Sequence, residues 1–373
     1  MQYFSHINNA DREKIFFKKP QTFSKYTDRD DLQYGLGAAL YIPATISNIK
    51  DRLFSGQLQG LTTAVICLED AISDHMVQEA EMKVIHELKS IHSMMLSGFL
   101  QIEELPLLFI RVRHVEQLKL LIKELGQAIQ VLTGIAIPKF HAANGIPYLQ
   151  LIRTVHNEIS PLYALPILES KQIIFKETRY EELKALQLML SAYKDVILNI
   201  RIGATDFSGL FGVRRPVDST IYDVAVVRDA ITDIINYFGR EENYFTLSAP
   251  VWEYFSKGEE GLIREVKTDL MNGLIGKTVI HPSHIGIVQA FHAISYENYI
   301  DACTIMNGAE SNLGVLKSDF ANKMNETKPH RFWAETIIKK SKIYGVLYEE
   351  RTFNDLLQAT KDISYSGKLI HKG

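Results

Sequence analysis

The sequence predicts an α/β protein whose main domain is a (β/α)8 TIM barrel, and three observations support this fold class. Eight short runs rich in aliphatic residues recur along the chain, amphipathic segments with helical spacing separate them, and the alternation occupies residues 39–293. Continuous apolar runs of this length are typical of parallel strands that are covered on both faces. Eight strand–helix units in about 255 residues match such a barrel, and an open doubly wound sheet is the competing architecture.

The eight expected strands follow one another at intervals that leave room for a helix. In chain order they are 39–44 (ALYIPA), 63–70 (TAVICLED), 107–113 (LLFIRVR), 134–139 (GIAIPK), 163–169 (YALPILE), 196–207 (VILNIRIGATDF), 244–253 (YFTLSAPVWE) and 276–282 (GKTVIHP). Apolar residues at three- and four-residue steps predict helices over 75–91 and 115–129.

Two segments flank this repeat. Residues 1–34 are polar, charged and aromatic without a clear period, so we expect an N-terminal arm there. Residues 295–373 have a helical pattern outside the eightfold repeat and are expected to form a C-terminal helical extension or lid. The expected TIM-barrel domain is 35–294.

Composition and charge limit the classes of partner. With 41 basic and 44 acidic residues the formal charge is −3, so no basic excess indicates nucleic acid or an anionic membrane. The two cysteines are far apart in sequence and indicate neither a disulfide framework nor a thiolate metal cluster. No apolar stretch approaches the roughly 20 residues that span a bilayer. We expect a cytoplasmic protein whose partners are small molecules and further copies of itself, in a homo-oligomer.

Most of the expected strands end in a chemically capable side chain. The carboxyl ends of barrel strands surround the active site in this fold, so charges at these positions converge on one rim. Charged residues also flank strands simply because strands end at the surface. The residues at these ends are Glu69, Asp70, Arg111, Arg113, Lys139, Glu169, Asp206 and His281.

Glu169 and Asp206 are the expected metal ligands. They end the fifth and sixth strands, which are neighbours about 5 Å apart in a barrel. Two carboxylates can anchor one Mg²⁺, which prefers oxygen ligands and keeps water molecules that an oxo acid can replace. The alternative is a pair of strand-end carboxylates bonded to the backbone or to a lysine.

Arg111 is the expected carboxylate-binding residue, because a guanidinium group offers two parallel hydrogen bonds to a substrate carboxylate. A salt bridge to Glu69 or Asp70 is the alternative, and both roles are compatible. Arg113 shares the same side of its strand but lies further out. Glu69 and Asp70 are adjacent and should point to opposite sides of a regular strand. We therefore assign Glu69 to the site, through metal-bound water or Arg111, and leave Asp70 as a helix cap or second acid.

Two further residues are candidates for substrate binding. Lys139 is expected to neutralise Glu169 or to contact substrate, with a structural ion pair as the alternative. His281 precedes Pro282 at the end of the last strand, where a structural role competes with substrate binding. The histidines show no HExxH-like spacing and have no cysteine companions, so a zinc site is not expected.

Six segments of the chain, in order, resemble the HpcH/HpaI aldolase and citrate lyase family, and in particular the branch of the citrate lyase beta subunit. These segments are VICLEDAI (65–72), FIRVR (109–113), GIAIPK (134–139), LPILES (165–170), GATDF (203–207) and GKTVIHPSHI (276–285). The resemblance extends from about Ala39 to about Val288. It implies a TIM barrel that cleaves or forms carbon–carbon bonds in oxo or hydroxy acids or their CoA thioesters, usually with Mg²⁺.

By position, the resemblance assigns the family's metal carboxylates to Glu169 and Asp206, its carboxylate-binding arginine to Arg111, and its acidic pair to Glu69 and Asp70. In CoA-dependent relatives an acidic residue of the C-terminal extension completes the site. The stretch KMNETKPHRFWAETIIKK resembles that region and makes Glu326 the candidate. The resemblance thus implies catalytic roles for Arg111, Glu69, Asp70 and Glu326.

Several positions depart from the family pattern. Cys67, Arg113, His141 and Thr205 stand where the family has an aspartate, an asparagine, a glutamate and a carboxylate, and the first strand end lacks the arginine of CoA-using members. These departures weaken the expectation of a CoA thioester and suggest a divergent substrate, as in the lyase-like members of tellurium-resistance gene clusters.

Two functions of other classes compete with a lyase. One is a catalytically weak barrel that acts as a binding or assembly component of a multi-enzyme cluster. The departures from the family pattern at the rim suggest this alternative. The other is a phosphotransferase, which lacks the support of a GxxxxGK[ST] loop.

Overall fold

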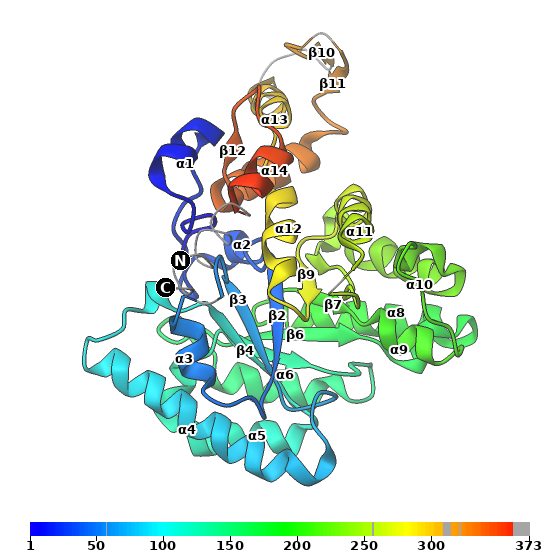
Figure 1. Ribbon diagram of the computed structural model, residues 1–373. Coiled ribbons are helices and arrows are strands. Elements are labelled where there is room, and N and C mark those ends of the chain that lie inside the picture. The colour runs from blue at the N-terminus through cyan, green and yellow to red at the C-terminus, as the bar shows by residue number, and fades with distance from the viewer. Residues whose placement is uncertain (57, 256, 309–314, 321, 361–373) are drawn as a thin grey trace. The chain divides into compact units, whose positions relative to one another are not determined.

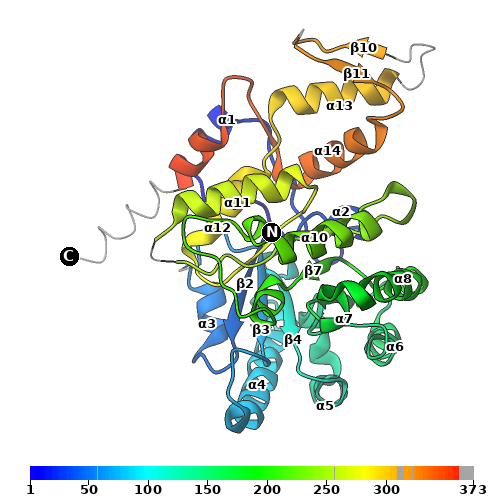
Figure 2. The same cartoon turned by 90° about the vertical axis from the view of Figure 1, so that its right-hand side faces the viewer.

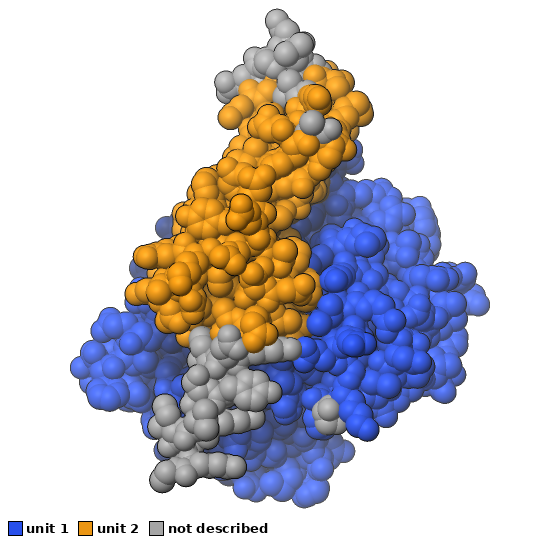
Figure 3. All heavy atoms as spheres, turned by 45° about the horizontal axis from the view of Figure 1, so that its top comes forward, with its two compact units in different colours: residues 1, 24–285 blue, residues 2–23, 286–373 orange. Residues whose placement is uncertain are grey.

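The computed structural model describes residues 1–56, 58–255, 257–308, 315–320 and 322–360. It divides the chain into two compact units. The first consists of Met1 and Ser24–Ile285, and the second consists of Gln2–Phe23 and the described residues from Gly286 onward. Figure 3 distinguishes the two units by colour. The expected N-terminal arm is therefore divided, because its first part belongs with the C-terminal segment and its last part belongs with the barrel.

The first unit contains eight parallel strands, and each of the eight expected apolar runs provides one of them. The strands are β2 (Ala38–Pro43), β3 (Thr63–Cys67), β4 (Leu107–Arg111), β5 (Gly134–Ile137), β6 (Tyr163–Leu168), β7 (Ile200–Ile202), β8 (Leu247–Ser248) and β9 (Lys277–Val279). Every strand except β2 is shorter than the run that predicted it, because residues at the ends of the run belong to the adjoining loops.

The strands close into a barrel. Their order is β8-β7-β6-β5-β4-β3-β2-β9, and a parallel bridge between Ala249 and Lys277 joins the two ends of this order. Every strand therefore pairs with the one before it in sequence, and the last pairs with the first. This arrangement confirms the predicted (β/α)8 barrel and excludes the open doubly wound sheet, whose strand order would reverse.

The barrel core explains the continuous apolar runs. Every residue of β3, β4, β5 and β6 is buried. Side chains of a strand alternate between the barrel interior and the layer of helices, so both sets must be apolar. Gly134 allows close strand packing, since a Cβ there would meet the backbone of Tyr163.

Helices cover the outside of the strands, as α4, α5, α6 and α8 show in Figures 1 and 2. The helices of this unit are α2 (Arg29–Leu32), α3 (Ile49–Phe54), α4 (Val77–Leu96), α5 (Val115–Leu125), α6 (Gly145–Val155), α7 (Lys171–Ile174), α8 (Lys176–Ala192), α9 (Ala204–Gly209), α10 (Ala225–Phe238) and α11 (Glu259–Met271), while α12 (Ser283–His292) continues into the second unit. Short 3₁₀ helices span Asp74–Met76, Ile102–Glu104, Gly126–Val131, Ile221–Asp223 and Glu241–Asn243.

The two helices predicted from apolar spacing are confirmed. Helix α4 buries Ala80, Val84, Leu88 and Ile91, which share one face at steps of three and four residues. Helix α5 ends earlier than expected, because Gly126 follows it with a positive φ of 51°. No helix of the described residues is long and apolar enough to span a membrane.

The second unit combines both ends of the chain. It contains α1 (Asn9–Ile15), β1 (Phe16–Lys18), α13 (Tyr296–Gly308), β10 (Val315–Lys317), β11 (Met324–Glu326), α14 (Arg331–Tyr344) and β12 (Val346–Leu347). Strand β1 pairs with β12, and β10 pairs with β11, both in antiparallel fashion. Helices α13 and α14 pack through Ala302, Ile305, Ala334 and Ile337. The helices expected in the C-terminal region are present, and residues 361–373 of that region lie outside the described residues.

Candidate functional site

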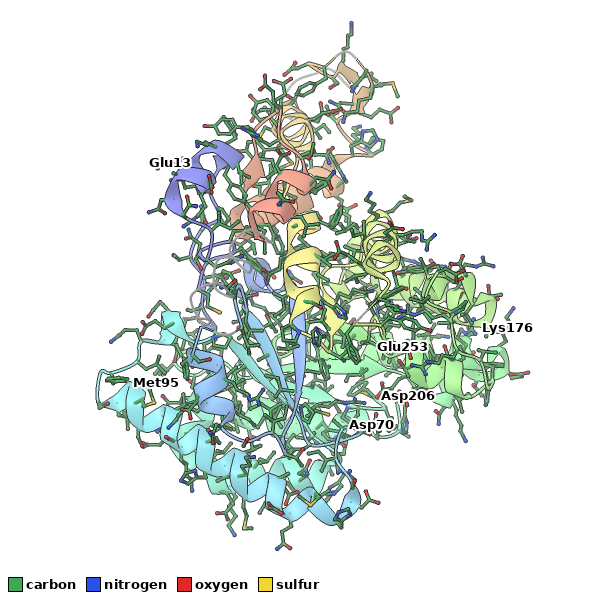
Figure 4. The ribbon with its side chains drawn as sticks, in the orientation of Figure 1. Glu13, Asp70, Met95, Lys176, Asp206 and Glu253 are labelled. Atoms are coloured by element: carbon green, nitrogen blue, oxygen red, sulfur yellow. The ribbon has the colours of Figure 1, made fainter. Side chains whose placement is uncertain are left out.

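A cavity of about 210 Å³ lies at the carboxyl ends of the barrel strands. Its polar lining residues come from six strands or from the loops that follow them, and they are Tyr41, Asp70, Arg111, Glu169, Arg201, Thr205, Asp206 and Thr278. Its apolar lining residues are Ile167, Ile202, Gly203, Val251 and Ile280. Figure 4 labels Asp70 and Asp206 near each other beside the strands. The cavity therefore lies where barrel enzymes bind substrate.

Glu69 and Asp70 both turn toward the same two cations. Arg111 Nη2 lies 2.8 Å from Glu69 Oε2 and 3.1 Å from Asp70 Oδ2. Lys139 Nζ lies 2.5 Å from Glu69 Oε1 and 3.3 Å from Asp70 Oδ1. The expectation that adjacent residues point to opposite sides is wrong here, because β3 ends at Cys67 and residues 69 and 70 lie in a turn, where strand alternation no longer applies.

The two carboxyl groups nevertheless differ in their electrostatics. Burial raises the pKa of Glu69, and the hydrogen bond with Asp70 adds to the shift while Arg111 and Lys139 oppose it. Burial acts on Asp70 in the same direction, but hydrogen bonding with Glu69 and the charges of Arg111 and Lys139 outweigh it and lower the pKa of Asp70. Asp70 lines the cavity and Glu69 does not. Asp70 is thus the acid exposed to a ligand, and Glu69 holds the two cations in place.

Arg111 is buried among three carboxylates. Besides its two contacts with Glu69 and Asp70, its Nη2 atom lies 3.0 Å from Glu169 Oε1. Burial alone would lower the pKa of Arg111, but the charge of Glu169 and its other neighbours raise it. The salt-bridge alternative is therefore present in the structure. The guanidinium group stays charged and joins the acidic pair after β3 to the carboxylate after β6.

Glu169 and Asp206 approach each other because of strand register. Leu168 of β6 pairs with Ile202 of β7, so Glu169 and Gly203 follow side by side, and Asp206 lies in the first turn of α9. Gly203 makes this approach sterically feasible, since a Cβ at that position would lie 2.6 Å from the Cβ atom of Glu169. A glycine in the GATDF segment is therefore required by the position of Glu169.

Both carboxyl groups have raised pKa values, chiefly because they are buried, although a hydrogen bond with Glu169 opposes the rise at Asp206. Burial raises the pKa of Glu169 to about 7, with Arg111 opposing the shift and the charge of Asp206 adding to it. Burial also raises the pKa of Asp206, and the charge of Asp70 adds to the effect. Negative groups with raised pKa values favour a bound cation, because it would replace the proton that one of them holds.

Lys139 uses both its backbone and its side chain in the site. Its backbone N–H donates to Glu169 Oε1 at 2.8 Å, and its φ of 48° lies in the left-handed region. Its side chain pairs with Glu69 and Asp70 and not with Glu169, so the structural ion pair is the alternative that the structure contains. Lys139 does not line the cavity.

The lining of the cavity includes none of the remaining sequence candidates, Arg113, His281 and Glu326. Arg113 donates to the carbonyl groups of Leu68, Glu69 and Ile72 and pairs with Asp74, so it fixes the loop after β3. His281 Nδ1 lies 2.8 Å from Ser283 Oγ at the start of α12. Glu326 ends β11 in the second unit, where its backbone N–H donates to His330 Nδ1 at 3.1 Å.

Sequence reasoning missed Tyr41, Arg201 and Thr278, because it examined strand ends and these residues lie within strands. The sequence signal for Arg201 is a charged residue that stands between two isoleucines, Ile200 and Ile202. Within the described residues no group of three or more His, Cys, Asp and Glu side chains is arranged to hold a metal ion. The candidate metal ligands are therefore the pair Glu169 and Asp206.

Comparison with known proteins identifies the class of protein. The family model described as a C–C bond lyase of the TIM-barrel fold matches residues 30–346. The chain therefore belongs to this family of carbon–carbon bond lyases, which confirms the enzyme class and the citrate-lyase-like family predicted from the six segments. Among curated proteins, none shows a significant match to the sequence.

One solved structure is similar in fold to this chain, and two further solved structures show weaker similarity. The protein CitE from Mycobacterium tuberculosis, in complex with magnesium, acetoacetate and coenzyme A, is 20% identical, and the match covers 83% of this chain and 99% of that chain with a TM-score of 0.53. RipC from Yersinia pestis is 18% identical over 69% of this chain and 94% of its own, with a TM-score of 0.46. The citrate lyase beta subunit from M. tuberculosis, with oxaloacetate and magnesium, is 19% identical over 69% and 97%, with a TM-score of 0.45.

Proposed function

We propose that this protein is a Mg²⁺-dependent carbon–carbon bond lyase or aldolase that acts on a small oxo or hydroxy carboxylic acid. One observation carries the proposal: Glu169 and Asp206, whose pKa values are both raised, face the same cavity as the buried guanidinium group of Arg111. Family membership supports the reaction class. The complex of the M. tuberculosis CitE protein with magnesium and acetoacetate supports the cofactor and the kind of substrate.

The donor set fits Mg²⁺. Carboxylate oxygens are its preferred protein ligands, and one or two carboxylates are sufficient because the ion keeps several waters. Glu169 and Asp206 would hold it. A bound Mg²⁺ supplies Lewis-acid stabilisation of the negative charge that develops on an enolate oxygen when the bond breaks.

The other residues of the site supply charge to the cavity and orient the side chains that line it. Arg111 keeps Glu169 fixed through its Nη2 contact at 3.0 Å and adds positive charge beside the substrate carboxylate. Asp70 faces the cavity with a lowered pKa, so it is ionised and can accept a hydrogen bond from a substrate hydroxyl group. Glu69 and Lys139 act as positioning residues for Asp70 and Arg111.

The group that accepts the proton from the reacting hydroxyl is assigned by the family resemblance alone. Glu326 is our candidate for this role. We also propose that a free acid, and not a CoA thioester, is the substrate, because the first strand end carries no arginine. Finally, we propose a homo-oligomer in the cytoplasm, a setting that agrees with two free cysteines, Cys67 and Cys303.

Isothermal titration with Mg²⁺, followed by a retro-aldol assay with a panel of hydroxy acids, tests this function. Glu169→Gln and Asp206→Asn should each abolish Mg²⁺ binding and metal-dependent product release. Asp218→Asn is a matched control, because this exposed carboxylate lies in the loop after α9 and outside the cavity. Full activity in both site variants would contradict the metal assignment. No binding of Mg²⁺ or of any acid by the wild-type protein would favour the assembly-component alternative.

A further inference from the structure

Tyr41 brings a phenol group to the cavity. It belongs to β2 and lines the cavity, and it is half-buried, so the part of its side chain that stays accessible faces the cavity. Its neighbours on the strand, Leu40 and Ile42, are buried and point to the other side, toward the layer of helices. The phenol group is therefore available to a molecule that enters the barrel.

Among the described residues that line the cavity, Tyr41 is the one suited to donate a proton to carbon. Glu169 and Asp206 are the candidate metal ligands, and the lowered pKa of Asp70 keeps that carboxyl group ionised. Arginine side chains keep their protons, and a threonine hydroxyl is a far weaker acid than a phenol. A phenol is neutral near pH 7 and is one of the groups that serve enzymes as general acids.

Positive charges lie close to this phenol group. The guanidinium carbon of Arg201 is 5.8 Å from the centre of the Tyr41 ring, and hydrogen bonding links the two side chains. Burial raises the pKa of Tyr41, and the charges of Arg201 and Arg111 oppose the rise. Cys67 and Glu169 add to it. Tyr41 thus carries its proton near neutral pH, and the phenolate left by its loss would lie next to a cation.

This arrangement gives the buried charge of Arg201 a use. Arg201 is 1% exposed, and its Nη2 atom donates to Thr278 Oγ1 at 2.6 Å. In the described part of the chain no carboxylate lies within ion-pair distance of it. Burying a charged group without a partner is costly. A phenolate on Tyr41 would supply that partner at the moment of proton transfer, so Arg201 can stabilise the anion without contacting a ligand itself.

Tyr41 lies across the barrel from the candidate metal ligands. Glu169 follows β6, and in the closed strand order β2 is four strands from β6, which is the opposite position in a barrel of eight. Cleavage of a carbon–carbon bond leaves an enolate whose oxygen belongs on the metal side and whose carbon, two bonds away, must take up a proton. That carbon extends from the metal side toward the wall that carries Tyr41.

We propose that Tyr41 is the catalytic acid that protonates the carbon of the enolate product, with Arg201 as its positioning residue. This inference rests on the proposed function above and adds the step that completes the reaction. The Oη–H bond of Tyr41 breaks, the electron pair of the enolate forms a C–H bond, and a phenolate remains beside Arg201. The phenolate recovers a proton from water once the product leaves. Because the substrate hydroxyl has given its proton to the base, the reaction gains and loses no net proton.

Proton exchange in a keto acid tests the inference, because exchange needs only this proton transfer and no bond cleavage. The full-length protein with saturating Mg²⁺ in D₂O should replace the methyl protons of pyruvate with deuterium, which ¹H NMR follows. Tyr41→Phe should slow the exchange by at least about 100-fold. Its affinities for Mg²⁺ and pyruvate, measured by isothermal titration, should stay at the wild-type values. The same exchange is measured in the product of any hydroxy acid that the retro-aldol assay finds to be cleaved.

Tyr163→Phe is the matched control. Tyr163 is a buried tyrosine of a barrel strand, β6, and does not line the cavity. This variant loses the same hydroxyl group and should exchange the methyl protons of pyruvate at the wild-type rate.

The pH profile of exchange tests the role of Arg201. Removal of a methyl proton requires the phenolate, so the exchange rate should rise with pH in the wild type. Arg201→Gln removes a charge that opposes the raised pKa of Tyr41, so the rise should move to higher pH. Arg201→Lys keeps the charge and should restore part of the wild-type profile. Thr278→Val removes the hydrogen bond that orients Arg201 and should move the profile in the same direction, which provides a test if Arg201→Gln does not fold.

Several results would overturn the inference by itself. Wild-type exchange in folded Tyr41→Phe would show that another group moves the proton, and equal loss of pyruvate binding and exchange would show that the hydroxyl group only binds the acid. Absence of exchange in a wild-type protein that cleaves an acid would also overturn it. An unchanged pH profile in folded Arg201→Gln or Thr278→Val would overturn the role of Arg201. Failure of the wild-type protein to bind Mg²⁺, or to act on any acid, would instead overturn the proposed function, and the inference with it.

Discussion

Replacing Gly203 with alanine is expected to displace Glu169 from the candidate metal site. A Cβ at position 203 would lie 2.6 Å from the Cβ atom of Glu169 and closer still to its Oε2 atom. Carbon atoms in contact are normally about 3.5–4.0 Å apart, so Glu169 must move by about 1 Å. The φ of Gly203 is −102°, outside the left-handed region, so the effect is steric and not a matter of backbone strain.

The expected consequence is a loss of metal binding and turnover in a folded protein. A displacement of about 1 Å in a catalytic group can reduce a rate about 100-fold. We expect at least about 10-fold weaker Mg²⁺ binding by isothermal titration and about 100-fold slower metal-dependent cleavage in the retro-aldol assay. The circular dichroism spectrum should match that of the wild type.

Gly209→Ala is the matched control. Gly209 ends the same short helix, α9, and a Cβ at this position would meet nothing within 4 Å. This variant should keep wild-type Mg²⁺ affinity. If Gly203→Ala also binds Mg²⁺ with wild-type affinity, the close packing of Gly203 against Glu169 does not hold the metal site, and the steric reasoning is refuted.

Three further predictions concern stability and loop order. Lys25 Nζ donates to two backbone carbonyl groups, and burial lowers the pKa of Lys25 to about 7. Between pH about 7 and 10 the unfolded protein therefore binds one more proton at Lys25 than the folded protein, so the free energy of unfolding should rise by about 1.4 kcal/mol per pH unit. Urea denaturation of Lys25→Met should lack this rise. Glu265→Gln should cost about 3 kcal/mol in chemical denaturation, because Arg215 and Lys277 would lose the buried carboxylate that they share and would keep only Glu253 and Asp269. The exposed Glu260→Gln on the same helix should change stability by less than about 0.5 kcal/mol, and equal effects of the two variants would contradict the assignment. Arg113→Met should speed backbone hydrogen exchange in the loop after β3 by about 10-fold, because this loop loses its charge-assisted hydrogen bonds to Arg113. Unchanged exchange rates would show that other contacts order the loop.

The fold could be predicted from the sequence because the alternation of apolar runs and amphipathic segments is repeated eight times. Each strand is covered on both faces, so its residues are apolar without interruption, as in the fully buried β4 and β6. Each helix has one buried face, as in α4. The pairing of residues 2–23 with the C-terminal segment was not readable, because it depends on the contact of β1 with β12, two short strands far apart in sequence.

The residues of the candidate site could be predicted from the sequence only in part. The rule that strand ends carry the chemistry led to Asp70, Arg111, Glu169 and Asp206, and all four line the cavity. The same rule led to His281, which contacts Ser283 outside the cavity lining. Strand ends share one rim in any parallel barrel, but the sequence does not say which of the side chains there turn inward.

The sequence by itself determined the eight strands and the rim that collects charge, because these follow from apolar periodicity and from the fixed direction of parallel strands, whereas the closed pairing order came from the structure. Only the tertiary structure decided that Glu69 and Asp70 share two cations, that Gly203 makes room for Glu169, and that the buried Arg201 lies beside Tyr41. The physical reason is that periodicity stops where a strand ends. Beyond that point the direction of a side chain depends on the loop conformation and on neighbours that the register brings from distant parts of the chain.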